Sequence, residues 1–344
     1  MSDRSHVSFA HLHRLSDLRG LFEHADGTTP RPEHGYCTDD NARLLVVTSR
    51  APHDDGADDD ELARLALRFL RDSQSADGRT RNRMDVDGRW TDEPTTEDCW
   101  GRSVWGLGTA SARHANPTVR RRARRAYDCS LRQRSRWSRA MAFAALGAAE
   151  VHAVDPSDHA TCALLSDALD VVLGGPTRRS FTDAGWLWPE PRLRYANAAL
   201  AEAVIAAGAA LGRDADRDLG LAMLSWLLEV ETRDGHLSVT GAGGRGPHER
   251  DAQFDQQPIE VAAMADACWR AHTITGDDDW LRGVDAPARW FEGDNDAGLS
   301  MIDPLSGGGY DGLHPRRVNL NQGAESTLAL VSTMQLAAQL APDT

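Results

Sequence analysis

Apolar residues recur along this 344-residue chain at the three- and four-residue spacing of amphipathic helices. Almost no segment shows the two-residue alternation of a long strand. The pattern predicts helices at residues 39–49, 59–73, 98–113, 117–132, 139–153, 158–173, 195–211, 216–232, 256–275, 278–291 and 322–340, with a twelfth within 9–24. Asn116, followed by Pro117, is an expected N-cap, and Asp158 and Asp216 are expected to cap their helices as well.

The helices alternate in how they begin. Every second helix follows a long segment rich in Gly, Trp, Pro and polar residues, while the helices between them follow short turns. The repeating unit is therefore a helical hairpin, and six such hairpins predict an all-α fold, an (α/α)6 toroid, as a single domain over residues 1–344. The inner helices would run parallel, with all their starts at one end. Segments 77–94, 236–246 and 299–318 are expected to form short β-hairpin or loop flaps over the pocket there.

The starts of the inner helices carry more polar residues than capping requires. A cap needs one residue, whereas these starts supply three to five, together with tryptophans in the neighbouring loops. Carboxylates and amides suit sugar hydroxyls, and aromatic rings suit the apolar face of a sugar ring. The candidate catalytic residues are Asp40, Asp98, Glu190 and Asp255. The candidate substrate-binding residues are His34, Tyr36, Asp39, Arg43, Trp100, Arg102, Trp188, Tyr195, Asn197, His236, Gln256, Gln257, Glu260, Tyr310, Asp311, Asn321, Gln322 and Glu325.

The carboxylates are expected to divide the roles of a glycoside hydrolase, which needs one acid and one ionised carboxylate. Asp39 and Asp40 point about 100° apart on a helix, so one is expected to cap while Arg43 orients the other. Glu190 stands beside two tryptophans, where burial would raise its pKa. The acid is then Glu190 or Asp98, and the ionised carboxylate is Asp40 or Asp255.

Composition and motifs narrow the function. The formal net charge is −14, and a clustered basic surface for nucleic acid is not evident apart from Arg120–Arg125, which is expected on an outer helix face. No apolar run approaches the roughly 20 residues of a membrane span, and the N-terminus is polar, so a cytoplasmic protein is expected. The five cysteines lack the spacing of a zinc site, and nucleotide-binding motifs are absent. Neither a metal nor a cofactor is expected.

Three motifs carry a family resemblance: His34 to Arg43, Phe254 to Glu260 and Asn319 to Ser326. They resemble a family of bacterial six-hairpin toroid proteins, glycosidase-like and often encoded beside glycosyltransferases and mannoside phosphorylases. The resemblance covers residues 9–339 and implies a carbohydrate-active toroid with a functional link to a glycosyltransferase. It assigns no catalytic residue. By fold alone, the chain also resembles unsaturated glucuronyl hydrolases and N-acylglucosamine epimerases.

The sequence therefore favours a metal-independent glycoside hydrolase that acts on short oligosaccharides through paired carboxylates. An inverting mechanism is favoured, because a wide mouth readily separates two carboxylates by the ~6.5–9.5 Å that a water-activating pair needs. One alternative is a sugar epimerase or isomerase in which His34 and His236 face each other across the toroid. Another is a non-catalytic sugar-binding partner of a glycosyltransferase. The sequence does not separate hydrolysis from phosphorolysis. A polysaccharide lyase that binds uronates through Arg43 and Arg102 is a further alternative, and it is less favoured than the others.

Overall fold

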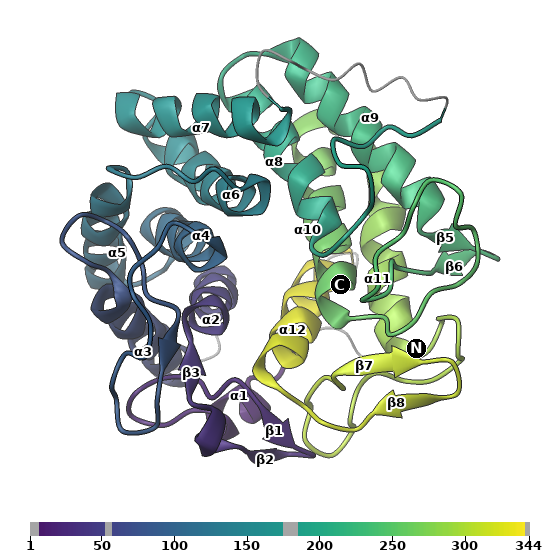
Figure 1. The fold of residues 1–344 in the computed structure, drawn as a ribbon, viewed down its shortest axis with the longest axis horizontal. Coiled ribbons are helices and arrows are strands. Elements are labelled where there is room, and N and C mark those ends of the chain that lie inside the picture. Colours follow the sequence, from purple (N-terminus) through teal and green to yellow (C-terminus); the bar gives the residue numbers. More distant parts are fainter. Residues whose placement is uncertain (1–6, 52–56, 175–184, 341–344) are drawn as a thin grey trace.

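Residues 7–51, 57–174 and 185–340 are described by the computed structural model, which is mostly helical. One set of helices forms an inner ring, and a second set lies outside it (Figure 1). The inner helices are α2 (Thr38–Arg50), α4 (Asp98–Arg113), α6 (Ser138–Val154), α8 (Asn197–Ala210), α10 (Pro258–Thr275) and α12 (Ala324–Ala338). The outer helices are α1 (Ala10–Arg14), α3 (Ala57–Ser73), α5 (Pro117–Ser130), α7 (His159–Val172), α9 (Asp214–Val230) and α11 (Arg282–Glu292).

The inner helices contact one another in chain order, and the ring closes where α12 packs against α2. Each of α3, α5, α7, α9 and α11 packs against the inner helix that precedes it. This arrangement confirms the predicted (α/α)6 toroid. Among the described residues, no helix has the length and apolar character needed to cross a membrane.

Small residues let the inner helices approach closely. A Cβ at Gly108 on α4 would lie 2.3 Å from the Gly147 carbonyl oxygen on α6, and a Cβ at Gly147 would lie 2.3 Å from the Val104 carbonyl oxygen. Any side chain at these two positions would push the backbones apart. On α6 every residue from Arg139 to Val151 is buried, whereas the outer helix α5 buries only one face and turns its arginine run outward. The outer-face interpretation of that run is confirmed.

The helix boundaries follow the prediction closely. Helix α4 has the predicted limits, and the other long helices apart from α11 begin and end within three residues of their predicted limits. Asn116 and Asp158 cap α5 and α7 as expected. Asp216 does not cap α9, because that helix begins two residues earlier, at Asp214. The predicted helix at 278–291 is a 3-10 turn, η3 (Asp278–Leu281), followed by α11, and the segment at 9–24 is helical only in α1.

The flaps are two-stranded antiparallel pairs. Strand β1 (Ala25–Asp26) pairs with β2 (Thr29–Pro30), and β5 (Thr232–Arg233) pairs with β6 (His236–Leu237). The hairpin of β7 (Gly312–His314) and β8 (Arg317–Asn319) lies in the predicted 299–318 flap. The 77–94 flap differs in part: Met84 does bridge Trp90, but β4 (Arg83–Met84) pairs with β3 (Tyr36–Cys37), the strand that leads into α2.

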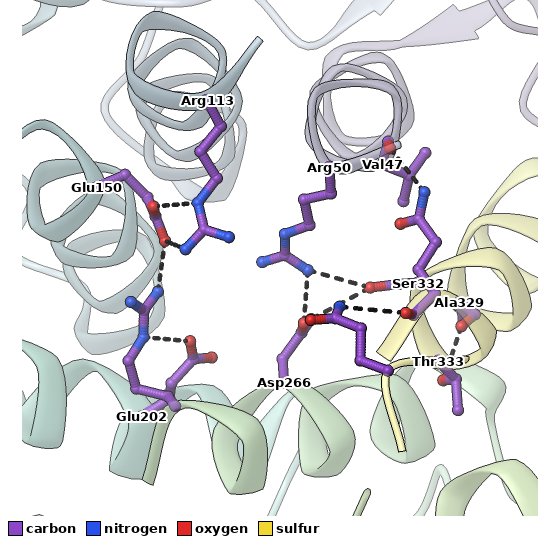
Figure 2. A network of polar contacts seen from close by, with 12 residues as sticks. Val47, Arg50, Arg113, Glu150, Glu202, Asp266, Ala329, Ser332 and Thr333 are labelled. Carbon is purple, nitrogen blue, oxygen red and sulfur yellow. Dashed lines mark hydrogen bonds and ion pairs between the residues drawn. The ribbon is translucent and has the colours of Figure 1, made fainter. Parts of the chain in front are cut away.

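A network of ion pairs connects the inner helices away from their starts (Figure 2). Arg50, the last residue of α2, donates to Asp266 of α10 over 2.6 Å. Arg113, the last residue of α4, pairs with Glu150 of α6. Arg270 of α10 bridges that same Glu150 to Glu202 of α8. Arginines at the C-terminal ends of α2 and α4 also lie where the helix dipole favours a cation.

Candidate functional site

The starts of the six inner helices line two neighbouring cavities, three starts to each. The first cavity, of about 300 Å³, is lined from the beginnings of α2, α10 and α12, and we call it the acidic cavity. The second, of about 750 Å³, is lined from the beginnings of α4, α6 and α8, and we call it the aromatic cavity. Both volumes suit a small ligand such as a sugar. The expected convergence of the helix starts is therefore observed, but on two cavities.

The acidic cavity holds a large excess of negative charge. Of its lining residues, only Arg43 and His24 can carry a positive charge. The carboxylates that line it are Glu23, Asp39, Asp40, Asp255, Asp311 and Glu325. Such a cavity disfavours an anionic ligand, because each desolvated like charge raises the energy of another. A neutral ligand with many hydroxyl groups suits it better.

Arg43 connects two of these carboxylates. Its guanidinium donates to Asp40 and to Glu325, each over 2.6 Å. Burial outweighs the attraction to Arg43 at Asp40 and raises the pKa of that carboxyl to about 6. At Glu325, burial acts in the same direction, but Arg43 and Arg102 outweigh it, so the pKa lies below its usual value. The first inner helix thus holds the Glu325 carboxylate ionised on the last.

Asp40 is better placed to support Arg43 than to act on a ligand. Its side chain is almost fully buried, and the Cys37 thiol donates to the oxygen that Arg43 does not use. The same thiol sulfur caps α2 by accepting from the Asp40 backbone N–H. The expected division of labour between the two aspartates therefore differs, since Cys37 is the cap and both Asp39 and Asp40 line the cavity.

Asp255 lines the acidic cavity, and its two carboxylate oxygens have different surroundings. One of its oxygens accepts from Gln257 over 3.0 Å, while the other, Oδ1, has no hydrogen-bond partner. His314 lies 3.9 Å from that oxygen. Burial raises the pKa of Asp255 above its ordinary value, although His314 and Gln257 oppose this. Gly312 lies directly against the carboxylate, because a Cβ there would be 2.4 Å from Oδ1.

Asp39 and Arg102 lie between the two cavities. Asp39 lines the acidic cavity, its oxygen Oδ1 lies 3.7 Å from Nε of Arg102, and burial raises its pKa. Asp98 lines the aromatic cavity, and its charge also acts to raise the pKa of Asp39. Asp39 Oδ1 and Arg102 Nη1 are both buried without a hydrogen-bond partner. Buried polar atoms of this kind are normally satisfied, so a ligand or water is the expected partner.

The aromatic cavity contains three further predicted residues: Asp98, Glu190 and Tyr195. Tyr195 donates its hydroxyl to Asp98. Both oxygens of Glu190 accept from Arg139, over 2.7 and 2.9 Å. This bidentate ion pair stabilises an ionised carboxylate, so the expectation of a proton-donating Glu190 is not supported.

The remaining predicted residues hold the site together or lie away from it. Tyr36 donates to Asp17, and Trp100 and Trp188 are buried. Gln256 bonds Asp296 and Trp290, while Gln322 bonds Ser306 and Asp303. Asn321 accepts from the Gly27 backbone, and Tyr310 donates its backbone N–H to Met301. These contacts explain much of the polarity of the helix starts: the side chains satisfy neighbouring loops.

Glu260 and Asn197 form a cap between two inner helices. The Glu260 carboxyl, in the first turn of α10, accepts from the backbone N–H groups of Ala196 and Asn197 and from the Asn197 side chain at the start of α8. Burial, which the two N–H groups oppose, raises the pKa of Glu260 to about 8. Neither residue lines a cavity.

The predicted pair of His34 and His236 is not brought together in either cavity. His236 bonds Asp296 over 3.1 Å, beside α11. His34 lies next to Glu33 and packs edge-on against His24. His24 is the histidine that lines the acidic cavity.

Among the described residues, Glu23, Cys37 and Asp40 place one potential ligand atom each within 4.8 Å of one another. Glu23 is paired with Arg83, and Asp40 with Arg43. Burial, together with the nearby carboxylates, raises the pKa of the Cys37 thiol, which favours the neutral form that binds metals poorly. The arrangement therefore fits a hydrogen-bonded cluster better than a metal site.

Several lining residues were not singled out from the sequence. Glu23, His24, Asn319 and Ser326 line the acidic cavity, and Trp137 and Arg139 line the aromatic cavity. The sequence did offer a signal for some of them. Trp137 and Arg139 begin the third inner helix, and Asn319 and Ser326 bracket the last polar start. Glu23 and His24 lie at the end of the segment 9–24, where a helix was expected and the structure is irregular after α1.

No protein-family model matches the chain, and no curated protein sequence matches it. Solved structures do match over nearly the full length. A sugar epimerase from a ruminal bacterium has a TM-score of 0.69 and 14% identity, covering 98% of this chain and 96% of its own. Cellobiose 2-epimerase from Bacillus thermoamylovorans has a TM-score of 0.70 and 12% identity, with 95% of both chains covered.

Glycoside hydrolases are also among the similar structures. The α-mannanase of glycoside hydrolase family 76 from Bacteroides thetaiotaomicron has a TM-score of 0.60 and 9% identity, covering 89% of this chain and 86% of its own. These likenesses establish the fold. The neighbours are carbohydrate-active enzymes, and they include both epimerases and hydrolases.

Proposed function

We propose that this protein is a glycoside hydrolase that acts on short, uncharged oligosaccharides in the acidic cavity. The observation that carries the proposal is the contrast between two carboxyl groups in one cavity: Arg43 donates to Glu325 over 2.6 Å, whereas Asp255 accepts only from the neutral amide of Gln257. The pKa shifts agree with this contrast, since the pKa of Asp255 is raised and that of Glu325 is lowered. Carboxyl groups whose environments separate their pKa values in this way suit the acid and the base of glycoside hydrolysis.

In this mechanism, Asp255 is the proton donor and Glu325 is the ionised carboxylate. Asp255 gives its proton to the glycosidic oxygen as the bond from that oxygen to the anomeric carbon breaks. Glu325 accepts a proton from a water molecule, whose oxygen forms the new bond to the anomeric carbon on the opposite face. Arg43 positions Glu325, and Asp40 in turn positions Arg43. Water is the only co-reactant, and its hydrogen and hydroxyl end on the leaving sugar and on the anomeric carbon.

Hydrolysis is favoured over phosphorolysis by the charge of the cavity. A phosphate nucleophile would enter among six carboxylates with Arg43 and His24 as the only lining cations. Phosphate sites are normally built from several arginines, lysines or helix N-termini free of acids. The same argument opposes uronates, and with them the lyase alternative, because Arg43 and Arg102 already serve carboxylates of the protein.

A sugar epimerase is the second candidate, on a different pair of histidines from that expected. His24 lines the acidic cavity, and His314 lies against Asp255. Histidines beside a sugar could exchange the proton on a carbon next to a carbonyl. The similar structures named as a sugar epimerase and a cellobiose 2-epimerase support keeping this candidate.

One assay separates these functions. Cellobiose, β-1,4-mannobiose and maltose are each incubated with the enzyme, with and without inorganic phosphate, and followed by proton NMR of the anomeric signals. Hydrolysis releases two monosaccharides independently of phosphate, and the first anomer formed reports inversion. Epimerisation changes the reducing-end signals without cleavage. Loss of cleavage in Asp255→Asn and Glu325→Gln, but not in the exposed controls Asp218→Asn and Glu61→Gln, would support the assigned roles. Cleavage that survives both changes would refute them.

A further inference from the structure

The aromatic cavity has its own ligand-binding character. It is larger than the acidic cavity, at about 750 Å³, and lies over the starts of α4, α6 and α8. This volume is within the range of about 300–1,000 Å³ that is typical of small-molecule sites. Its lining combines hydrogen-bonding groups from Asn82, Thr95 and Asp98 with two aromatic rings, those of Trp137 and Tyr195.

Both rings are unusually exposed. Among the large hydrophobic side chains that the described residues leave exposed, only Trp137 and Tyr195 are aromatic, at 47% and 45% exposure, and both line this cavity. Burial of such rings is strongly favourable, so two exposed rings in one cavity indicate a surface that a ligand covers. Aromatic faces next to carboxylates and hydroxyls suit a sugar, which has an apolar ring face and polar edges.

Arginines support the two rings. The Arg136 guanidinium lies 4.4 Å from the centre of the Trp137 ring, and that of Arg139 lies 4.6 Å from the centre of the Tyr195 ring. Each guanidinium therefore lies over one face of its ring, within the distance of a cation–π contact. Tyr195 is also fixed by its bond to Asp98, and Arg139 by its ion pair with Glu190. The site is therefore pre-organised, which reduces the entropy lost on binding.

The two cavities adjoin at Asp39 and Asp98. These aspartates line different cavities, yet the charge of one affects the pKa of the other, and Arg102 interacts with both. Arg102 Nε lies 3.7 Å from Asp39 Oδ1, which places this arginine beside the acidic cavity. A ligand that extends out of the acidic cavity on the side of Asp39 would therefore approach Asp98 and the aromatic cavity.

We infer that the aromatic cavity binds the sugar units of an uncharged oligosaccharide that extend beyond the unit held in the acidic cavity, with Trp137 and Tyr195 as stacking platforms. This inference rests on the proposed function for the location of the reacting unit. It makes the substrate a di- or trisaccharide and gives Trp137 a role in binding, separate from the acid and the base.

The test measures binding by titration calorimetry in the Asp255→Asn background, so that turnover does not interfere. Cellotriose, β-1,4-mannotriose and maltotriose are compared with glucose and mannose, with and without Trp137→Ala. At least one trisaccharide should bind, and Trp137→Ala should weaken it roughly tenfold, the effect of losing one stacking contact of about 1.4 kcal/mol. Trp137→Phe should restore most of the affinity, while monosaccharide binding should not change.

The control is Trp280→Phe, at a tryptophan in η3 that lines neither cavity, and it should leave every affinity unchanged. Equal trisaccharide affinities with and without Trp137, or no binding of any trisaccharide, would overturn the inference. The outcome is independent of the proposed chemistry. If trisaccharide binding depends on Trp137 but the wild type does not cleave the ligand, the proposed hydrolase function is refuted and the binding role of the aromatic cavity is supported. Cleavage with a KM that Trp137→Ala leaves unchanged would refute only the site.

Discussion

Arg43, on the first inner helix, donates to Glu325 at the start of the last inner helix over 2.6 Å. This contact joins the two helices at which the ring closes and fixes the ionised carboxylate of the proposed reaction. The structural role and the catalytic role therefore meet in one guanidinium, whose other nitrogen serves the buried Asp40.

Arg43→Gln should destabilise the protein by about 3–5 kcal/mol, because it leaves a buried carboxylate without its partner. Urea denaturation followed by circular dichroism measures this. The matched control is Arg64→Gln, since Arg64 makes an exposed ion pair with Asp60 and its loss should cost less than about 1 kcal/mol. Similar midpoints for the two variants would show that Arg43 does not hold the ring closed.

The activity should be highest on the acid side of neutrality. Cleavage needs Glu325 ionised and Asp255 protonated, so the rate should rise as pH increases through the lowered pKa of Glu325 and fall through the raised pKa of Asp255. The pH dependence of kcat/KM measures both limbs. In the residual activity of Glu325→Gln, the rise in rate at acidic pH should be absent. In the residual activity of Asp255→Asn, the fall in rate at higher pH should be absent. A rate that increases steadily up to pH 8 contradicts these assignments.

Gly312→Ala should impair catalysis without unfolding the protein. Gly312 does not have a left-handed backbone, so alanine fits its conformation, but the new Cβ would lie 2.4 Å from Asp255 Oδ1 and displace that carboxylate. We expect a fall in kcat of about tenfold or more, since a displaced proton donor loses most of its contribution. Gly243→Ala is the control, because a Cβ there meets no atom within 4 Å. Equal kcat values in both variants would show that Asp255 is not the proton donor.

The ion-pair network of Figure 2 should make stability depend on pH in two opposite ways. At Glu150, Arg270 and Arg113 outweigh burial and lower the pKa to about 2, so its stabilising contribution is present above pH 4.5 and is lost as pH falls toward 2. At Glu202, burial outweighs Arg270 and raises the pKa to about 7, so its contribution is present below pH 4.5 and is lost as pH rises through 7.

Thermal unfolding between pH 4.5 and 8 checks the second effect. The wild type should lose stability across this range relative to Glu202→Gln, because glutamine cannot ionise. The conservative change keeps a group that can accept from Arg270, so packing is preserved. Parallel curves for the two proteins would show that Glu202 does not titrate in the folded state above its ordinary pKa.

The ring of helices was predictable because burial imposes a regular pattern. Inner helices such as α6 carry mostly small and apolar residues on all sides. Outer helices such as α5 are apolar on one side only, and the two kinds alternate along the chain. The convergence of polar helix starts followed from that alternation. Single caps such as Asp216 were less certain, since neighbouring acidic residues offer competing starts.

The roles of individual residues at the starts of the inner helices were less predictable, because they depend on which side chains pair across the ring. Glu190 was expected to be a proton donor from its two tryptophan neighbours, but its partner Arg139 lies 51 residues earlier in the chain. Glu260 was expected to bind substrate, but it caps α8. The division of the space above these helix starts into two cavities depends on the same pairings. The link to a glycosyltransferase, the cytoplasmic location and the single-domain organisation stay predictions.

The most direct test of the central claim is a crystal structure of Asp255→Asn soaked with the trisaccharide that it binds most tightly. Our account predicts one sugar unit in the acidic cavity, with a glycosidic oxygen within hydrogen-bonding distance of residue 255 and the anomeric carbon facing Glu325. The next unit should lie beside Asp39 and Arg102. A sugar bound with its glycosidic bonds remote from both carboxyl positions, or one whose reducing-end carbons lie between His24 and His314, would contradict it.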